Sequence, residues 1–586
     1  MMPQRQRAIY VFVFLAFGFT LVSMRLVNIM LTQHEKFVAE ATKNHWRSVE
    51  LPARRGSIVD ANGIELAQSY LLHDVRLDGE ILEKPERNLP RVAALLDLPV
   101  SDLYAKFDPE DRYLLLKKDV DDDTVEALKA LELRALIFEP NYKRAYPNGG
   151  LASQLIGFMS HEDKGVLGIE KLMEAQLRGR AGKRLYEKDG RRREIAAFRR
   201  RDVPPVDGGE VMLTIDLGIQ HAVEEELDRL VVEFQPERIY AVCVRPQTGE
   251  ILAMASRPSF NPSQRDTIKP ALMKNFCVTD SLEPGSIFKI VPIAGALNDG
   301  IVTRHTPIYC ENGRFFFAGH YLHDSHPIEV ATVEEVMHES SNIGIGKITL
   351  NHGEERFNYY LRAFGFGEKT NFLAGQGESA GIVRPVDTWA RIDVTRIPIG
   401  QGVSATPLQL AMSMAVIANG GKLMQPMLVK QIRDAEGNVV KRGLPKMVRR
   451  VIKPETARIV AEMLEGVIEE GTGTKARVIG FPAAGKTGTA QKAENGVYAD
   501  GKYVASFSGF VPVEDPQFVL LIMVDDPKGD VYYGGSVAGP AFSNISRKIT
   551  QCLGLVPANQ PRVVPGGEVP VAVQHNPNQE PRHETY

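Results

Sequence analysis

Three short segments of the chain combine residue types that carry out nucleophilic acyl transfer. They are Ser286–Lys289 (S-x-x-K), Ser340–Asn342 (S-x-N) and Lys486–Thr489 (K-T-G-T), and we refer to them as the S-x-x-K, S-x-N and K-T-G segments. Each string occurs readily by chance, and a second S-x-N string begins at Ser259. The prediction therefore depends on finding all three in this order, which indicates a serine acyl-enzyme mechanism.

The S-x-x-K segment supplies a nucleophile and its base. Ser286 and Lys289 are three residues apart at the start of an almost uniformly apolar run, which predicts a buried helix with both side chains on one face. A serine hydroxyl is a weak nucleophile until a base removes its proton, and a lysine kept neutral by burial or by a second cation is such a base. Lys486 is the predicted second cation.

The S-x-N segment supplies proton transfer and orientation. The Ser340 hydroxyl can pass a proton to the leaving amine, and the Asn342 amide can orient both the lysine and the substrate. Taken alone, a serine before a helix is more often only a helix cap. The functional interpretation rests on the combination with the other two segments.

The K-T-G segment predicts a strand edge that binds substrate. Lys486 and the hydroxyls of Thr487 and Thr489 can hold a substrate carboxylate, and Gly488 lets the substrate lie close to the backbone. We expect the backbone N–H groups of Ser286 and Thr489 to form the oxyanion hole.

The elements that must position these segments are a sheet and its covering helices. The predicted elements are a strand at 211–215, a helix from the N-cap Asp216 to 232, a hairpin of 240–244 with 251–256, a strand at 518–524 and a closing helix at 541–552. The hairpin strands are apolar runs, so the sheet is buried on at least one face.

An apolar run at the N-terminus predicts a single membrane anchor. Residues 8–24 carry no charge, and together with 26–31 they reach the roughly 20 residues that span a bilayer. No small-residue cleavage site follows, so we expect an uncleaved signal-anchor with the chain beyond it outside the cytoplasm.

Composition and turn signals divide the chain into five parts. Residues 1–7 form a cytoplasmic tail, 8–31 the transmembrane signal-anchor, 32–205 a first α+β domain, 206–556 the catalytic domain and 557–586 a disordered tail. In the first domain, Asn62-Gly63 predicts a hairpin turn, and the arginine-rich stretch 179–201 is interpreted as a solvated hairpin.

The overall composition is that of an ordinary globular protein large enough for several domains. Of 586 residues, 44% are hydrophobic and 24% are charged, and the net charge is −3. This charge argues against nucleic acid as the main partner. The four cysteines form no C-x-x-C pair, so neither a zinc site nor a disulfide scaffold is predicted, and Cys277 is interpreted as a packing residue.

With these segments the chain resembles the class B penicillin-binding proteins, which carry one membrane anchor. Further segments with the same resemblance are Arg55–Asp60, Arg144–Pro147 and Gly165–Glu170 in the first domain, and Ala255–Pro262, Ile399–Gly402 and Thr406–Gln409 in the second. The resemblance implies an α+β multidomain fold. After the anchor it places an elongated pedestal domain of the dimerisation type, and then a transpeptidase domain, similar to serine β-lactamases, with a central antiparallel sheet flanked by helices.

The same resemblance implies a peptidoglycan D,D-transpeptidase or carboxypeptidase without metal or organic cofactor. Ser286 is then the residue that attacks the D-Ala-D-Ala bond of a stem peptide, releases D-alanine and passes the acyl group to an amine of a neighbouring strand. β-Lactams are expected to acylate the same serine. The asparagine of the S-x-N segment is similar to the cell-division (FtsI-like) branch, which implies septal synthesis with an FtsW-like glycosyltransferase and other divisome proteins. The implied location is the inner membrane, with the catalytic domain on the periplasmic side.

Four alternatives stay open at this point. An elongation-type transpeptidase, a β-lactam sensor that is acylated once and a non-catalytic divisome scaffold all share the three segments. A serine β-lactamase needs a deacylating base, for which Glu354 and Asn358 (E-x-x-x-N) are candidates. They follow Asn342 closely and fall in a stretch of helical periodicity, which disfavours that role.

Overall fold

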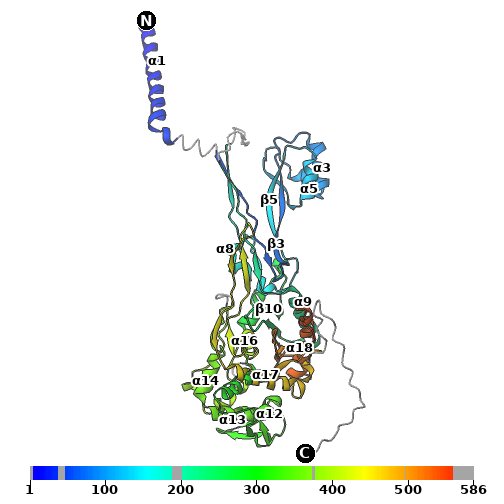
Figure 1. Ribbon diagram of the computed structural model, residues 1–586. Coiled ribbons are helices and arrows are strands. Elements are labelled where there is room, and N and C mark those ends of the chain that lie inside the picture. The colour runs from blue at the N-terminus through cyan, green and yellow to red at the C-terminus, as the bar shows by residue number, and fades with distance from the viewer. Residues whose placement is uncertain (1–3, 37–45, 188–200, 373–376, 495–496, 558–586) are drawn as a thin grey trace, which may run out of the picture. The chain divides into compact units, whose positions relative to one another are not determined.

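The computed structural model describes residues 4–36, 46–187, 201–372, 377–494 and 497–557 (Figure 1). Residues 558–586 of the predicted tail and 188–200 of the arginine-rich stretch lie outside these ranges.

The described chain packs into two compact units. The N-terminal unit holds the residues up to 213 together with 261–268 and 429–444, and the C-terminal unit holds 214–260, 269–428 and the residues from 445 onward. Three segments of the predicted 206–556 domain, 206–213, 261–268 and 429–444, therefore pack with the N-terminal unit. The domain limits themselves stay a prediction.

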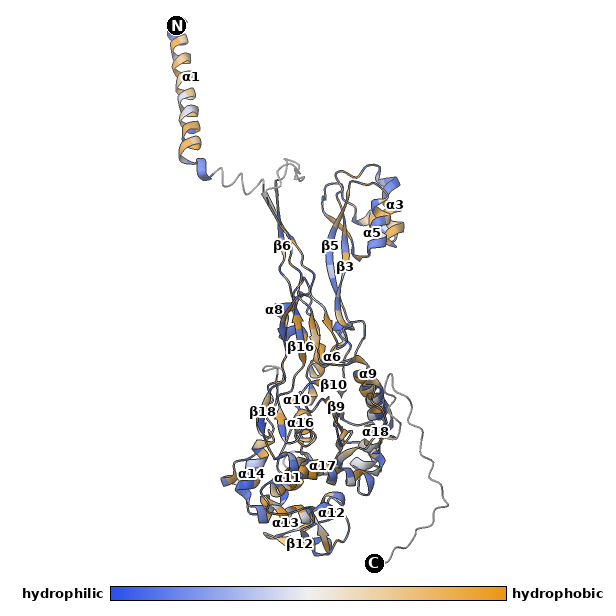
Figure 2. Ribbon diagram, in the orientation of Figure 1, coloured by the Kyte–Doolittle hydropathy of each residue, from blue (hydrophilic) through white to orange (hydrophobic). Residues whose placement is uncertain are grey.

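The predicted anchor is a helix with an apolar surface. Helix α1 (Gln4–Val27) continues into a π-helical turn (Asn28–Thr32), and its side chains are exposed. Within the stretch Gln4–Leu31, a window of 18 residues has a mean hydropathy of 2.0, and the helix is long and apolar enough to cross a membrane (Figure 2).

The N-terminal unit is built on antiparallel hairpins. One sheet has the strand order β1 (Trp46–Leu51), β6 (Gly182–Glu187), β7 (Arg201–Val203). The other has the order β17 (Val439–Arg442), β16 (Val429–Arg433), β8 (Val211–Leu213), β2 (Ile58–Val59), β3 (Glu65–Leu77), β4 (Leu114–Val120), with β5 (Leu136–Ala145) also paired to β3. The predicted Asn62-Gly63 turn joins β2 to β3, which pair antiparallel.

Short helices complete the N-terminal unit. They are α3 (Pro85–Leu96), α4 (Val100–Lys106), α5 (Asp122–Lys129), α6 (Ser153–Ile156), α7 (Gly168–Leu172) and α8 (Glu174–Leu177). Apolar side chains of α3, α4 and α5 form a core with β3, β4 and β5. Asp121 caps α5 by accepting from the N–H of Thr124 at 2.8 Å.

The three segments of the first domain that carried the family resemblance meet in one buried ion network. Glu170 is fully buried, and its carboxylate accepts from Nε of Arg55 at 2.8 Å and from Nε of Arg144 at 2.7 Å. The Tyr146 hydroxyl lies 3.3 Å from the same carboxylate, and Arg55 also pairs with Glu174 at 2.7 Å. The network joins residues that are far apart in sequence.

The C-terminal unit has the predicted central antiparallel sheet flanked by helices. Its strand order is β10 (Ile251–Arg257), β9 (Arg238–Val244), β21 (Phe518–Asp525), β20 (Val497–Val511), β19 (Ala484–Glu494). Helices α9 (Leu217–Phe234) and α18 (Gly534–Cys552) form a hydrophobic core with one face of the sheet. Helix α16 (Pro407–Ala418) contacts β9, β20 and β21.

Most predicted elements of this unit are confirmed. Asp216 caps α9 by accepting from the N–H of Ile219 at 3.1 Å, and β9 and β10 form the expected hairpin. The remaining elements are α10 (Phe276–Thr279), α11 (Ile290–Asn298), α12 (Val333–His338), α13 (Asn342–His352), α14 (Glu354–Ala363), α15 (Asp393–Arg396) and α17 (Pro454–Glu469), with the strand pairs β11 (Pro307–Tyr309)/β14 (Val330–Thr332), β12 (Arg314–Phe317)/β13 (His320–His323) and β15 (Lys422–Met424)/β18 (Met447–Arg450).

Helix α18 begins at Gly534, earlier than the predicted start at 541. A Cβ on Gly534 would stand 2.1 Å from the carbonyl O of Gly488, so only glycine lets this helix end approach β19 so closely. The predicted start was wrong because glycines close to a proline are more typical of a turn than of a helix.

Candidate active site

Ser286 lies in the first turn of the catalytic helix, and that turn is a 3₁₀-helix. The 3₁₀-helix η5 (Gly285–Lys289) leads directly into α11, which is buried from Ile290 to Ala296. Because a 3₁₀-helix has three residues per turn, the side chains of Ser286 and Lys289 point the same way. The turn is tighter than the α-helix that the sequence predicted.

The turn that carries Ser286 packs directly against β19, the edge strand that holds the K-T-G segment. A Cβ on Gly488 would stand 3.0 Å from Cγ2 of Ile287, and a Cβ on Gly285 would stand 3.0 Å from Cβ of Ala490. Since its neighbours on both sides contact β19, Ser286 itself lies alongside this strand. Gly488 thus has a packing role that the sequence analysis missed.

Lys289 joins the S-x-x-K and S-x-N segments. Its side chain is fully buried, and its Nζ lies 2.8 Å from Oδ1 of Asn342, 2.5 Å from the carbonyl O of Ser340 and 3.2 Å from Oγ of Ser340. The Asn342 amide is held in this orientation because its Nδ2 donates to the carbonyl of His323 at 2.8 Å.

Burial and a neighbouring cation favour the neutral form of Lys289. Desolvation lowers the pKa of Lys289 well below its usual value, the charge of Lys486 lowers it further, and the carboxylate of Asp324 opposes both effects. Burial alone lowers the pKa of Lys486 to about 7. The direction in which Lys486 acts on Lys289 agrees with its predicted role as a second cation.

The two threonines of the K-T-G segment already have protein partners. Oγ1 of Thr489 accepts from the N–H of Gly534 at 3.0 Å, and Oγ1 of Thr487 lies 2.8 Å from Oγ1 of Thr472. Nζ of Lys486 donates to the carbonyl O of Thr487 at 3.3 Å. A hydroxyl has one donor and two acceptor sites, so these contacts orient both groups and leave capacity for a ligand.

Sequence reasoning missed Asp324, which lies directly after β13. Its Oδ1 accepts from the backbone N–H of Asn342 at 2.5 Å, and its Oδ2 accepts from Oγ of Ser341 at 2.7 Å. No spacing rule links this aspartate to the S-x-N segment, so no signal in the single sequence identifies it.

A close approach of two glycines supports the Ser286 turn, and it yields a prediction. Gly400 has φ +85°, and a Cβ there would stand 2.4–2.7 Å from backbone atoms of Gly285. Gly400→Ala must displace the turn, and we expect acylation by penicillin to slow at least ~10-fold, since small misplacements of reacting groups cost this much. Stopped-flow acylation measures the effect.

Gly300→Ala is the matched control for this variant. Gly300 has φ +73° and open space around the missing Cβ, so alanine adds backbone strain without a clash. Equal slowing in both variants would contradict the steric explanation.

The residues considered for β-lactamase deacylation lie on α14, where helical periodicity predicted them. Within the part of the chain that the structure describes, no hydrogen bond links Glu354 or Asn358 to the S-x-x-K or S-x-N segments.

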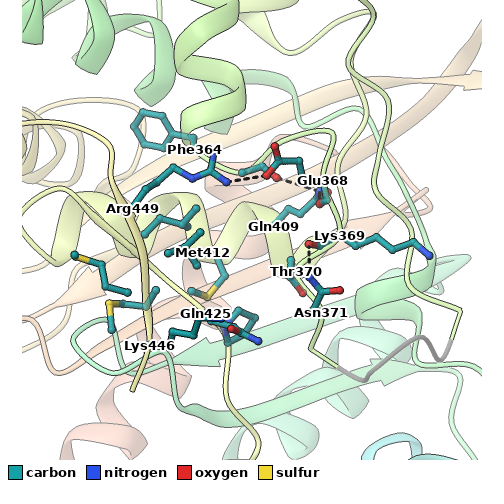
Figure 3. Close-up of a pocket in the computed structure, with 16 residues that line it drawn as sticks. Phe364, Glu368, Lys369, Thr370, Asn371, Gln409, Met412, Gln425, Lys446 and Arg449 are labelled. Carbon is teal, nitrogen blue, oxygen red and sulfur yellow. Dashed lines mark hydrogen bonds and ion pairs between the residues drawn. The ribbon is translucent and has the colours of Figure 1, made fainter. Parts of the chain in front are cut away.

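A separate cavity of about 330 Å³ lies elsewhere in the C-terminal unit (Figure 3). It is lined by residues of α16, β15 and β18 and by the ion pair between Glu368 and Arg449 at 2.7 Å. No residue of the three segments lines it. Over the described ranges, no group of three or more His, Cys, Asp or Glu side chains could hold a metal ion.

Comparisons with known proteins agree with this geometry. The family model described as "Penicillin binding protein transpeptidase domain" matches residues 239–547, and the one described as "Penicillin-binding Protein dimerisation domain" matches residues 50–213.

The chain is 32% identical to stage V sporulation protein D of Bacillus subtilis, over 94% of this chain and 86% of that protein. It is 30% identical to the peptidoglycan D,D-transpeptidase FtsI of Escherichia coli, over 91% of this chain and 89% of that protein. A crystal structure of penicillin binding protein 3 from Mycobacterium tuberculosis, complexed with aztreonam, aligns with a TM-score of 0.67 at 28% identity, covering 87% of this chain and 98% of that one.

Proposed function

Because the chain belongs to the class B penicillin-binding proteins, we propose that it is a peptidoglycan D,D-transpeptidase with Ser286 as the acylated nucleophile. The observation that carries the proposal is the environment of Lys289. This lysine is fully buried, contacts Ser340 and Asn342, and has a pKa far below the usual lysine value.

The contacts of Lys289 leave its lone pair for a hydroxyl proton. A neutral amine has two N–H donors and one lone pair. The carbonyl O of Ser340 and Oδ1 of Asn342 accept only, so they take both N–H groups. The lone pair then accepts a proton from a serine hydroxyl, which is what a general base must do.

The acylation step follows from these roles. The Ser286 hydroxyl attacks the carbonyl of the penultimate D-alanine as its proton passes to Nζ of Lys289, and the oxyanion is stabilised by the N–H groups of Ser286 and Thr489. The proton then passes through Oγ of Ser340 to the leaving amine, the C–N bond breaks, and D-alanine departs. Lys486, with the threonine hydroxyls beside it, holds the terminal carboxylate.

Deacylation reverses the proton path. The amine of a neighbouring strand attacks the ester carbonyl and gives its proton through Ser340 to Lys289, while the ester C–O bond breaks and Ser286 regains a proton. β-Lactams mimic the donor, so they are expected to acylate the same serine and to stay attached.

We further propose that α1 anchors the protein in the inner membrane with both units on the periplasmic side, and that it acts in septal synthesis. The S-x-N segment and the relatives named FtsI support the septal role, which implies an FtsW-like glycosyltransferase and other divisome proteins as partners. The domain limits at 32–205 and 206–556 belong to this proposal.

The test uses the full chain in detergent with lipid-linked pentapeptide substrate, followed by mass spectrometry. The proposal expects D-alanine release together with cross-linked product, both blocked by penicillin, and a lasting penicillin adduct on Ser286 that Ser286→Ala lacks. An adduct without D-alanine release would indicate a sensor or scaffold, and rapid penicillin turnover a β-lactamase. A fluorescent fusion on the lateral wall rather than at the division site would contradict the septal role.

A further inference from the structure

Asp324 holds the S-x-N segment from outside the three catalytic segments. Its Oδ1 accepts from the N–H of Asn342 at 2.5 Å and from the N–H of Ile343 at 3.0 Å. Its Oδ2 accepts from Oγ of Ser341 at 2.7 Å, and that Oγ in turn accepts from the N–H of Gly344 at 2.9 Å. Asp324 and Ser341 together therefore satisfy the first three N–H groups of α13, which have no partner within the helix.

The residue before Asp324 fixes the side chain of Asn342. The carbonyl of His323 accepts from Nδ2 of Asn342 at 2.8 Å, which leaves Oδ1 of the amide directed at Nζ of Lys289. One dipeptide thus holds both the backbone and the side chain of Asn342. The position of the amide relative to Lys289 depends on these contacts.

The contacts of His323 and Asp324 also support a backbone conformation that serine rarely adopts. Ser340 has φ +57°, in the left-handed region, and its carbonyl is one of the two acceptors on Lys289. Such a conformation costs of the order of 1–3 kcal/mol and persists only where the surroundings enforce it. The anchored start of α13 at Asn342, two residues further on, provides that enforcement.

The charge of Asp324 also acts on the base. Lys486 on β19 and Asp324 after β13 are the charged groups that act on Lys289, and they act in opposite directions. A negative charge at the N-terminus of α13 also interacts favourably with the helix dipole.

We propose that Asp324 is a positioning residue for acylation, which holds Ser340 and Asn342 against Lys289 and balances the charge of Lys486. The proposal rests on the proposed function, because it takes Lys289 as the base. It adds a residue that touches neither substrate nor nucleophile.

The test measures acylation by a fluorescent penicillin across pH, with rate constants normalised to the active fraction found by mass spectrometry. Asp324→Asn keeps the size but removes the charge. Its amide oxygen can still accept from the α13 N–H groups, and its NH2 group then stands where Oδ2 of Asp324 accepts from Oγ of Ser341. We expect its plateau rate to fall at least ~10-fold, because the base and its partners shift. The acid limb is the part of the pH profile in which the acylation rate falls as the pH is lowered. We also expect this limb to move to lower pH, since loss of the carboxylate lowers the pKa of Lys289 further.

Two further variants separate positioning from general stability. Asp216→Asn changes another helix-capping aspartate of the same unit, at α9, and should leave rate and acid limb unchanged. If Asp324→Asn does not fold, Asp324→Glu carries the test, because it keeps the charge but displaces it by one methylene; a lower plateau with the parental acid limb is then expected.

The outcomes are distinct for the two proposals. If the parent protein forms no adduct, the proposed function falls and this inference with it. If the parent reacts and Asp324→Asn has a rate constant within twofold of it and the same acid limb, this inference alone is overturned, whatever the change in melting temperature. Likewise, a parental rate in Asp324→Glu after failure of Asp324→Asn to fold would overturn it.

Discussion

Replacing Lys289 by arginine abolishes acylation of Ser286, even though the positive charge is kept. Arginine stays protonated at any workable pH, so it has no lone pair to accept the serine proton. We expect the rate of penicillin acylation to fall by ~10³-fold or more. Losses of this scale are seen when the base that activates a catalytic nucleophile is removed. Lys289→Met, which removes the amine altogether, should lose as much.

Lys347→Arg provides the matched control for this substitution. Lys347 is a half-buried lysine on α13 that donates to the carbonyl of Tyr309 at 2.8 Å and to Glu311 at 2.6 Å. Arginine can make the same contacts, so the acylation rate should stay within about twofold of the parent. Substantial acylation by Lys289→Arg would show that a neutral amine at this position is not required.

The acid limb of the same reaction reports the protonation of Lys289. Its pKa is lowered, and only the neutral amine is active, so the rate falls as pH drops through that pKa. Lys486 contributes to the lowering, so Lys486→Gln should raise the pKa of Lys289 and move the acid limb to higher pH. An acid limb that stays in place or moves the other way would contradict the coupling of the two lysines.

The sequence allowed the central chemistry to be predicted because it is local in the chain. Ser286 and Lys289 lie within one turn, and Asn342 within two residues of Ser340, so spacing alone indicates which side chains share a face. The long apolar strands at 240–244 and 518–524 and the N-cap Asp216 are also local signals, and the structure confirms them.

What could not be predicted arises from contacts between distant segments. Asp324 acts on Asn342 across a loop, the strand β14 and the short helix α12, and a single capping carboxylate leaves no periodic pattern. The left-handed φ of Ser340 is enforced by its surroundings rather than by residue preference. Strands β16 and β17 carry many charged or exposed residues, so their place in the sheet of the N-terminal unit follows from tertiary pairing alone.

The buried ion network of the N-terminal unit gives the largest expected effect on stability. Removing the carboxylate in Glu170→Ala leaves the guanidinium groups of Arg55 and Arg144 buried, with only Glu174 still paired to one of them. Breaking a buried pair by removing one partner typically costs ~3–5 kcal/mol, because the remaining charge keeps its desolvation penalty. Catalysis should be spared, since these residues and the S-x-x-K segment belong to different compact units.

Scanning calorimetry of the soluble region, with penicillin acylation measured in parallel, tests this separation. A loss of this size lowers the melting transition of a unit of about 200 residues by roughly 10 °C, whereas the transition of the penicillin-reactive unit should stay in place. Glu139→Ala is the control, because it breaks the more exposed pair with Arg76 in the same unit, which contributes only ~0–1 kcal/mol. If Glu170→Ala and Glu139→Ala destabilised the unit equally, the buried network would contribute no more to the free energy of unfolding than the exposed pair does. If Glu170→Ala also slowed acylation in proportion to its loss of stability, the two units would unfold as one.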